Sequence, residues 1–273
     1  MRAEERTLVA HLCAAKAGLM VDAAKDYPIE SRLAPLARRE GFASIGEMLQ
    51  AIRSRREEKL IWALVEAMTP GETAFFRDRK AFGQLAEILP VLARRREGAP
   101  LRIWSAACSS GQEIYSVAML VEELAGANAG FGVEMFASDL SERRLEKAQS
   151  GLYTQFEVQR GLPVRRLVDH FEQRDDMWTI TPRLRQAIRW RRINLIADLA
   201  PVGKFDVILC RYALKGMSAQ HRGQVLRGLA AALPADGVLM LGLGESAAEG
   251  GEALEAAGPS GLFRRNPAFR VAA

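Results

Sequence analysis

The chain has 273 residues, of which 49% are hydrophobic and 26% charged, and its formal net charge is +5. This length suits one α/β domain together with a smaller one, and the apolar content is sufficient for a buried core. There is no run of 18 or more apolar residues and no charged-then-apolar leader, so we expect a soluble, cytoplasmic protein without membrane insertion.

Metal-binding side chains are sparse and scattered. Cys13, Cys108 and Cys210 have no paired spacing, and the three histidines are far apart, so we expect free thiols and no metal dependence. The positive charge occurs in mixed runs without interleaved aromatic residues. Nucleic acid is therefore an unlikely partner.

Residues 1–66 predict an all-helical domain. Apolar residues recur at helical spacing over residues 4–17, 30–40, 45–55 and 57–68, with Ser44 as the expected cap of the third helix. Residues 67–79 are expected to form a connector that carries Arg77 and Asp78. An arginine in this aromatic context needs an anionic partner, which is either a substrate or Asp78.

The rest of the chain, residues 80–273, predicts a sheet domain. A helix over residues 80–96 and a turn over 97–100 lead to a buried strand that begins near Ile103. Small residues and Gly111 then predict a tight turn into a helix that reaches Glu123. Such a turn lets a ligand approach the backbone, although it also serves as an ordinary strand-to-helix connection.

A second strand is expected over residues 131–139, followed by a helix over 142–149. An acid at the tip of this strand can accept hydrogen bonds from both ribose hydroxyls of a nucleoside. Asp139 is therefore the candidate cofactor anchor, and a helix cap is its alternative role. The turn before it lacks the three-glycine dinucleotide fingerprint and a phosphate-loop lysine, which disfavours nicotinamide and triphosphate ligands.

An inserted β-subdomain is expected at about residues 152–191. Alternating apolar and polar residues at 177–181 and 188–191 predict a short antiparallel pair, split by a helix over 182–187. Further strands over 205–210 and 237–244 flank an amphipathic helix at 221–233. Strands that alternate with helices in this way indicate a doubly wound, Rossmann-like α/β sheet.

Several separated motifs resemble those of the CheR family of chemotaxis receptor methyltransferases, from about residue 17 to the end. Residues 68–78 resemble the family's Thr-x-Asn-x-Thr-x-Phe-Phe-Arg signature, and residues 104–115 its Ser-Ala-Ala-Cys-Ser-x-Gly-Glu-Glu-Pro-Tyr motif. Residues 137–139, 192–195, 210–211 and 242–246 match further family segments in the same order. The resemblance implies a methyltransferase sheet domain that follows an all-helical domain.

The family's function, carried over by this resemblance, is methyl transfer from S-adenosylmethionine to glutamate side chains of chemoreceptors, without a metal. Arg77 is then the catalytic residue that steers the acceptor carboxylate. The implied cofactor-binding residues, which would also hold the product S-adenosylhomocysteine, are Thr73, Arg77, Glu113, Asp139, Asn194, Leu195, Arg211 and Tyr212.

The resemblance also implies partners. In the family, basic side chains of the helical domain dock against receptor helices, and the candidates here are Arg32, Arg38, Arg39, Arg53 and Arg55. In some members the inserted subdomain pairs with a peptide at the receptor's carboxyl terminus. A plain structural flap is the alternative for this insert.

Three departures from the family pattern leave two function hypotheses open. Gly71 stands where the family has Asn, Tyr212 where it has Asn, and Gly216 where it has Tyr. Tyr212 could stack on the adenine, restore a hydroxyl from a new direction, or fill the pocket. The first hypothesis is a working protein-glutamate methyltransferase; the second is a degenerate member that binds the cofactor or a protein partner and regulates without turnover.

Overall fold

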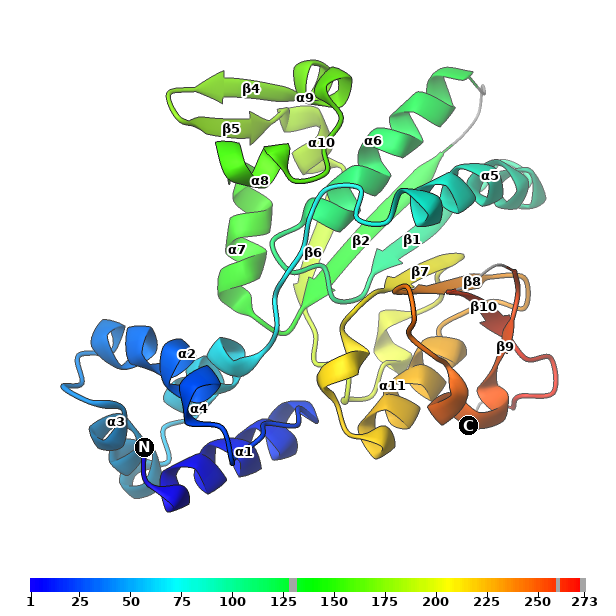
Figure 1. Ribbon diagram of the computed structural model, residues 1–273. Coiled ribbons are helices and arrows are strands. Elements are labelled where there is room, and N and C mark those ends of the chain that lie inside the picture. Colours follow the sequence, from blue (N-terminus) through cyan, green and yellow to red (C-terminus); the bar gives the residue numbers. More distant parts are fainter. Residues whose placement is uncertain (128–131, 259–260, 271–273) are drawn as a thin grey trace. The chain divides into compact units, whose positions relative to one another are not determined.

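The computed structural model describes residues 1–127, 132–258 and 261–270 (Figure 1). Phe131, the expected first residue of the second strand, lies outside the described residues. The chain divides into two compact units. One comprises Met1–Pro70 with Leu214–Arg222, and the other Gly71–Ala213 with Gly223–Ala273.

The first unit contains four helices: α1 (Ala3–Ala17), α2 (Asp26–Arg39), α3 (Ile45–Arg55) and α4 (Glu58–Met68). Their apolar faces meet in a core in which Val9, Leu33 and Leu64 are completely buried. The Ser44 hydroxyl accepts a hydrogen bond from the Glu47 amide at 3.1 Å, so the expected cap of the third helix is confirmed. Helix α2 begins four residues earlier than expected. Among the described helices, none is long and apolar enough to cross a membrane.

The second unit is built on a seven-stranded sheet with the order β6-β2-β1-β7-β8-β10-β9 (Figure 1). The first five strands in that order run parallel, and β10 joins β8 and β9 antiparallel. The strands are β1 (Leu101–Ser105), β2 (Val133–Asp139), β6 (Ile188–Arg192), β7 (Val207–Cys210), β8 (Val238–Leu241), β9 (Leu254–Ala256) and β10 (Leu262–Arg265).

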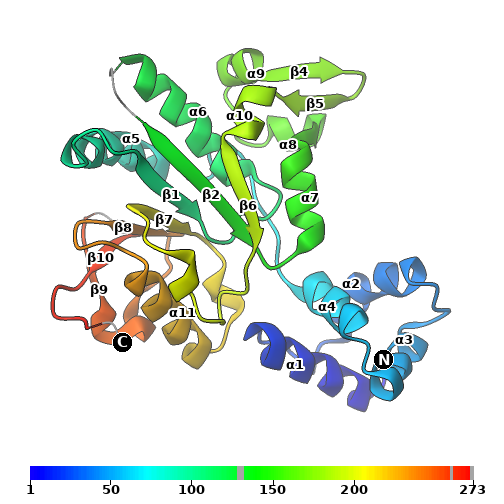
Figure 2. The ribbon, with the colours of Figure 1, turned by 180° about the vertical axis from the view of Figure 1, so that it is seen from behind.

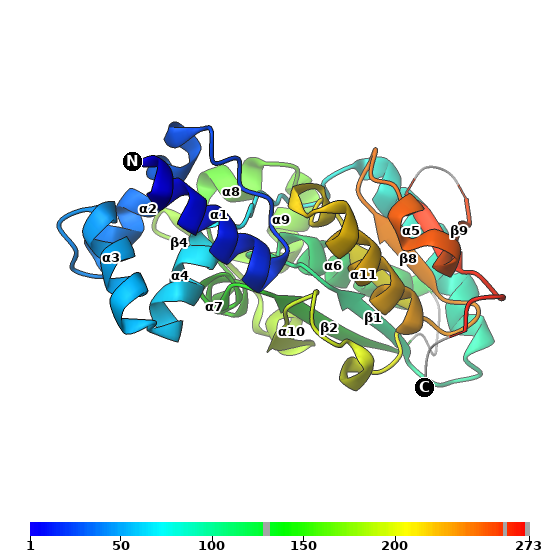
Figure 3. The same cartoon turned by 90° about the horizontal axis from the view of Figure 1, so that it is seen from below.

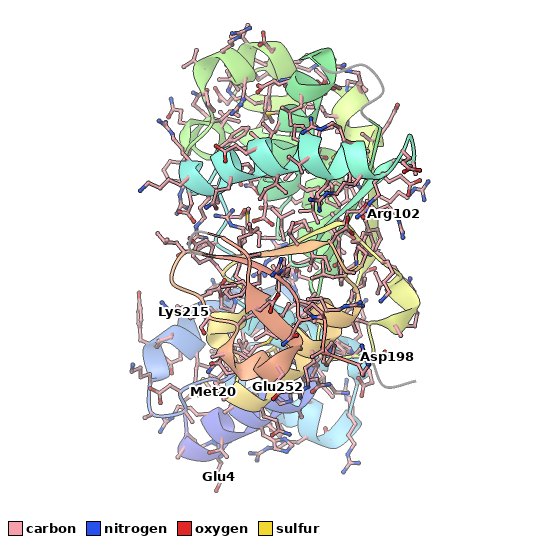
Figure 4. The ribbon with its side chains drawn as sticks, turned by 90° about the vertical axis from the view of Figure 1, so that its right-hand side faces the viewer. Glu4, Met20, Arg102, Asp198, Lys215 and Glu252 are labelled. Atoms are coloured by element: carbon pink, nitrogen blue, oxygen red, sulfur yellow. The ribbon has the colours of Figure 1, made fainter. Side chains whose placement is uncertain are left out.

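Helices cover both faces of this sheet. Helices α5 (Arg79–Arg95) and α6 (Gln112–Ala127) lie on one side, and α11 (Ala219–Ala231) on the other (Figures 1 and 3). On the side of α11, the Trp104 ring packs against Phe136 and Phe205, with centroids 6.1 and 5.3 Å away. The Arg102 guanidinium lies 4.6 Å from the centre of the Phe205 ring, beside the start of β1 (Figure 4). The doubly wound fold predicted from the sequence is therefore present.

An insert follows α7 (Glu142–Ser150). It forms a separate three-stranded sheet with the order β3-β5-β4 (Figure 2). Its elements are β3 (Leu152–Thr154), α8 (Gln155–Gln159), α9 (Val164–His170), β4 (Phe171–Arg174), β5 (Met177–Ile180) and α10 (Pro182–Gln186). The two ends of the insert touch, because Arg185 donates a hydrogen bond to the Ser150 carbonyl at 3.2 Å and the Ile180 amide donates to the Gly151 carbonyl at 2.9 Å.

The expected pairing of residues 177–181 with 188–191 is wrong. Strand β5 lies between β3 and β4, whereas β6 pairs in parallel with β2, from Met135 opposite Ile188 to Asp139 opposite Arg192. Alternation in β6 arises because this edge strand buries Ile188 and exposes Arg189. An alternating pattern shows that one face of a strand is buried, but it does not identify the strand with which it pairs.

Candidate active site

The candidate site lies where the order of the strands reverses. From β1 the chain proceeds outward to β2 and β6, then returns to β7 on the other side of β1. The carboxyl ends of β1 and β7 are therefore neighbours, and Ser105 lies opposite Leu209 in their register. Ligands of open α/β sheets bind beyond the strand ends at such a switch point.

The turn after β1 is tight and is fixed against the end of β2. Ser109 and Gly111 have positive φ values of +51° and +92°, and the Cys108 amide donates to the Ser138 carbonyl at 2.9 Å. A Cβ atom on Gly111 would lie 2.9 Å from the Ala148 side chain, so helix α7 leaves no room for one. Burial raises the pKa of the Cys108 thiol well above its usual range, which keeps this cysteine from acting as a nucleophile.

Asp139, at the end of β2, holds the same turn. Its carboxylate accepts hydrogen bonds from the Ser109 amide at 2.8 Å and the Ser141 amide at 2.9 Å, and the residue is 5% exposed. Helix α7 is capped instead by the Ser141 hydroxyl, which accepts from the Arg144 amide at 3.3 Å. Asp139 is thus not the cap of α7, and the alternative role considered for it is wrong.

A buried arginine joins β7 to the segment that carries Arg77. The Arg211 guanidinium donates to Glu113 at 3.1 Å, to Asp78 at 2.7 Å and to the Arg77 carbonyl at 2.7 Å. Glu113 also accepts from the Ser105 hydroxyl at 2.8 Å. Two carboxylates therefore neutralise a side chain that is only 2% exposed. Asp78 therefore pairs with Arg211, whereas the sequence suggested Asp78 as a partner of Arg77.

Tyr212 covers Arg77. The Arg77 guanidinium lies 3.7 Å from the centre of the Tyr212 ring, and the phenol donates a short hydrogen bond to Asp78. The Leu243 amide donates to the phenol oxygen at 3.1 Å, and Glu245 accepts from the Tyr212 amide at 2.6 Å. Burial, and then the bond to Asp78, raises the pKa of Tyr212, so the phenol keeps its proton and acts as a donor. The Tyr212 ring thus lies against Arg77 at the wall of the cavity.

What remains between these groups is a cavity of about 30 Å³, enough for a water molecule but far smaller than a nucleoside. Its lining residues are Glu72, Thr73, Ala74, Arg77, Ala107, Ser109, Glu113, Arg211 and Tyr212. Five of the cofactor-binding candidates thus share one cavity: Thr73, Arg77, Glu113, Arg211 and Tyr212.

The other three candidates lie outside the cavity's lining. Asp139 reaches it through Ser109, whose amide it binds. Asn194 and Leu195 follow β6, where the Ile193 amide donates to the Asp139 carbonyl at 3.1 Å. The Asn194 side chain accepts from the Ile196 amide at 3.3 Å, and Leu195 is buried. The structure brings both residues to the end of β2 but not to the cavity.

Arg144 was not identified from the sequence. A Cβ atom on Gly71 would lie 2.3 Å from the Arg144 guanidinium carbon, so this guanidinium occupies the space that a side chain at position 71 would use. The Gly71 carbonyl accepts a hydrogen bond from the Ser109 hydroxyl at 2.8 Å. Gly71 and Arg144 are therefore neighbours in the fold, and no local sequence signal connects the two residues.

The remaining candidates belong to the helical unit. A Cβ atom on Gly216 would lie 2.9 Å from a Leu19 methyl group, so a larger residue there requires that flexible side chain to shift. The five basic partner candidates all lie on α2 and α3 with exposed side chains: Arg32, Arg38, Arg39, Arg53 and Arg55. Arg32 also donates a hydrogen bond to the Met68 carbonyl at the end of α4.

The sheet is doubly wound, its second strand ends on a carboxylate, and the turn after β1 lacks the dinucleotide fingerprint. These features are those of the Rossmann-like nucleoside-binding class that includes methyltransferases. Residues 71–258 match the family model of the CheR methyltransferase SAM-binding domain, and residues 5–69 that of the CheR methyltransferase all-alpha domain. The chain belongs to the CheR methyltransferase family.

Similar proteins include the chemotaxis protein methyltransferase Cher2 of Pseudomonas putida, 36% identical over 84% of this chain and 85% of that protein. Chemotaxis protein methyltransferase 1 of Pseudomonas aeruginosa is 38% identical over the same shares of the two chains. Among solved structures, TrmN from Thermus thermophilus aligns with a TM-score of 0.39 and 20% identity, over 66% of this chain and 48% of that one.

Proposed function

We propose that this protein transfers methyl groups from S-adenosylmethionine to glutamate side chains on the cytoplasmic helices of chemoreceptors. The observation that carries the proposal is that Arg77, Glu113 and Arg211 line one cavity at the switch point. Asp139 accepts a hydrogen bond from the amide of Ser109, which lines the same cavity. The names of the relatives, chemotaxis protein methyltransferases, support the same activity.

The donor set suits the cofactor. Asp139 and Glu113 are carboxylates that can accept from hydroxyl and amino groups, and Thr73 supplies a hydroxyl at the cavity wall. The present volume of about 30 Å³ does not suit it until the Tyr212 ring leaves. When bound, the cofactor supplies an activated methyl group on a sulfonium.

The protein's contribution to transfer is alignment. An ionised glutamate is already a nucleophile, so the site must orient it in line with the methyl group and exclude water. Arg77 can hold the acceptor carboxylate through its planar fork once its stack with Tyr212 opens. Arg211 fixes the backbone of Arg77 by donating a hydrogen bond to the Arg77 carbonyl.

Two surfaces of the protein suit the receptor. The exposed arginines of α2 and α3 carry positive charge that would steer and orient an acidic helix. In the insert, β3 and β4 are the outer strands of the small sheet, and an added peptide strand at either edge would form main-chain hydrogen bonds.

A second candidate function is regulation without turnover. It is favoured by the closed cavity, because Tyr212 stacks on the side chain that would receive the acceptor and shares Asp78 with Arg211. In this case the protein binds S-adenosylmethionine, S-adenosylhomocysteine or a protein partner, and transfers no methyl group.

The experiment is transfer of a radiolabelled methyl group from S-adenosylmethionine to membranes that contain the organism's chemoreceptors. A glutamate methyl ester releases methanol in mild alkali, whereas methylated nitrogen does not. We expect alkali-labile label that Arg77→Ala abolishes, while S-adenosylhomocysteine still binds this variant; Asp139→Ala should lose that binding. Binding without label supports the second candidate, and alkali-stable label would contradict the glutamate assignment.

A further inference from the structure

The segment of residues 75–78, here called the Arg77 segment, has an unusual backbone. Phe76 has φ +47° and Asp78 φ +63°, so the residues on both sides of Arg77 are in the left-handed region that side chains rarely adopt. Such a conformation persists only where neighbouring groups enforce it. The placement of Arg77 therefore depends on what surrounds this segment.

The insert provides one wall for the segment. Gly161 has φ +96°, and a Cβ atom there would lie 2.2 Å from the Phe75 carbonyl oxygen, so the two backbones are in direct contact. The Phe75 ring is completely buried and meets the rings of Tyr153 and Phe171 edge-on, with centroids 5.1 and 5.5 Å away. All three partners of Phe75 belong to the insert.

Arg166 connects the insert to the segment and to the main sheet domain. Its guanidinium lies 4.0 Å from the centre of the Phe76 ring and donates two hydrogen bonds to Glu123 of α6, at 2.6 and 2.7 Å. The hydrogen bond from Arg166 is the main cause that lowers the pKa of Glu123. The Phe76 amide donates to the Ser116 hydroxyl, also on α6, at 2.9 Å. The Phe76 backbone is thus bound to α6, and the Phe76 ring is covered by Arg166, which α6 holds through Glu123.

We propose that the insert positions Arg77 for methyl transfer, and that Arg166 of α9 is the positioning residue. The stacking of the Arg166 guanidinium on Phe76 and its two hydrogen bonds to Glu123 hold the Arg77 segment in its left-handed conformation. In this proposal Arg166 has no direct part in the chemistry, and its effect on Arg77 runs through Phe76. The inference rests on the proposed function, in which Arg77 steers the acceptor carboxylate.

The kinetic test uses Arg166→Gln, which removes both the stacked cation and the fork. We expect kcat for receptor methylation to fall by roughly tenfold, since small displacements of an aligning group slow transfer steeply. The KM for S-adenosylmethionine and the Kd for S-adenosylhomocysteine should change less than kcat does, because Glu113 and Asp139 lie outside the Arg77 segment. The conservative Arg166→Lys keeps the charge over Phe76 and should recover part of kcat.

Arg165→Gln is the matched control. Arg165 is the neighbouring arginine on α9, its side chain is 92% exposed, and it pairs only loosely with Asp169 at 3.6 Å. Its replacement changes the charge of α9 equally but leaves Phe76 covered. We expect kcat to remain that of the parent protein.

Amide hydrogen exchange over residues 75–78 tests the contact independently of activity. We expect exchange to accelerate by roughly tenfold in Arg166→Gln and to stay unchanged in Arg165→Gln. Unchanged exchange in Arg166→Gln overturns the proposal whatever the kinetics are, and faster exchange with full kcat overturns the link to Arg77. If the parent protein transfers no methyl group, the proposed function fails, whereas the exchange result still decides whether Arg166 holds the segment.

Discussion

Replacement of Tyr212 by alanine tests whether this side chain closes the cofactor site. In the structure its ring stacks on Arg77, its hydroxyl binds Asp78, and the cavity that remains is about 30 Å³. Under the proposed function the cofactor occupies this cavity, so the ring must move away before it binds. The free energy that holds the ring in place is therefore subtracted from the free energy of cofactor binding.

The size of this effect follows from the contacts. A cation over a partly buried ring contributes about 1 kcal/mol, and a hydrogen bond to a carboxylate about 2 kcal/mol. The conformational entropy that the side chain loses when it is held in place opposes them by about 1 kcal/mol. A net preference of about 2 kcal/mol leaves roughly 3% of the molecules open, which weakens apparent binding by about 30-fold.

The assay is calorimetric titration with S-adenosylhomocysteine. We expect Tyr212→Ala to bind about 30-fold more tightly than the parent protein, and Tyr212→Phe to lie between them because it keeps the stack but loses the bond to Asp78. Tyr27→Ala, at an 81% exposed position on α2, serves as the control and should change nothing. Equal or weaker binding by Tyr212→Ala would refute the reasoning and would place the phenol among the groups that hold the cofactor.

Two further predictions concern stability. Gly161→Ala should lower the free energy of unfolding in urea by about 3 kcal/mol, because its Cβ would meet the Phe75 carbonyl at 2.2 Å. The control Gly98→Ala has a similar φ of +93° but open space around the Cβ, and should lower it by about 1 kcal/mol. Similar losses in the two variants would contradict the contact. Arg96 donates to Asp236 at 2.7 Å, and this hydrogen bond lowers the pKa of that carboxyl below its usual 3.8. Its stabilising contribution is complete above the unfolded pKa and is lost as the pH falls through the lowered folded value. Asp236→Asn, which leaves the bond from Arg96 to Asp206 in place, should therefore cost about 1 kcal/mol near pH 6 and less near pH 3, since solvent screens the pair; a cost independent of pH would argue against it.

The strand, the tight turn and the helix at residues 103–115 could be predicted because their signals are local. A buried apolar run, small residues and Gly111 specify that geometry within a dozen positions. Asp139 could be identified for the same reason, since it directly ends an apolar strand. Its hydrogen bond with Ser109 then follows from the parallel register of β1 and β2.

The parts that could not be predicted depend on pairs that are distant in the chain. The partner of β6 is β2, about 50 residues earlier, and alternation within β6 does not encode it. Asp78 binds Arg211 across a separation of 133 residues, which is why the sequence offered Asp78 to the adjacent Arg77 instead. Arg144, the neighbour of Gly71, lies in a highly charged helix with the ordinary pattern of a solvated face.

The insert begins and ends at one point, where Arg185 binds the Ser150 carbonyl and Ile180 the Gly151 carbonyl. A module attached by adjacent ends can be lengthened, shortened or exchanged without any change to the register of the parent sheet. Selection could therefore vary the length and surface of this module while the strands of the main sheet stay the same. The freedom stops at Gly161 and Arg166, because these residues contact the Arg77 segment and α6, and any replacement module would have to supply their contacts.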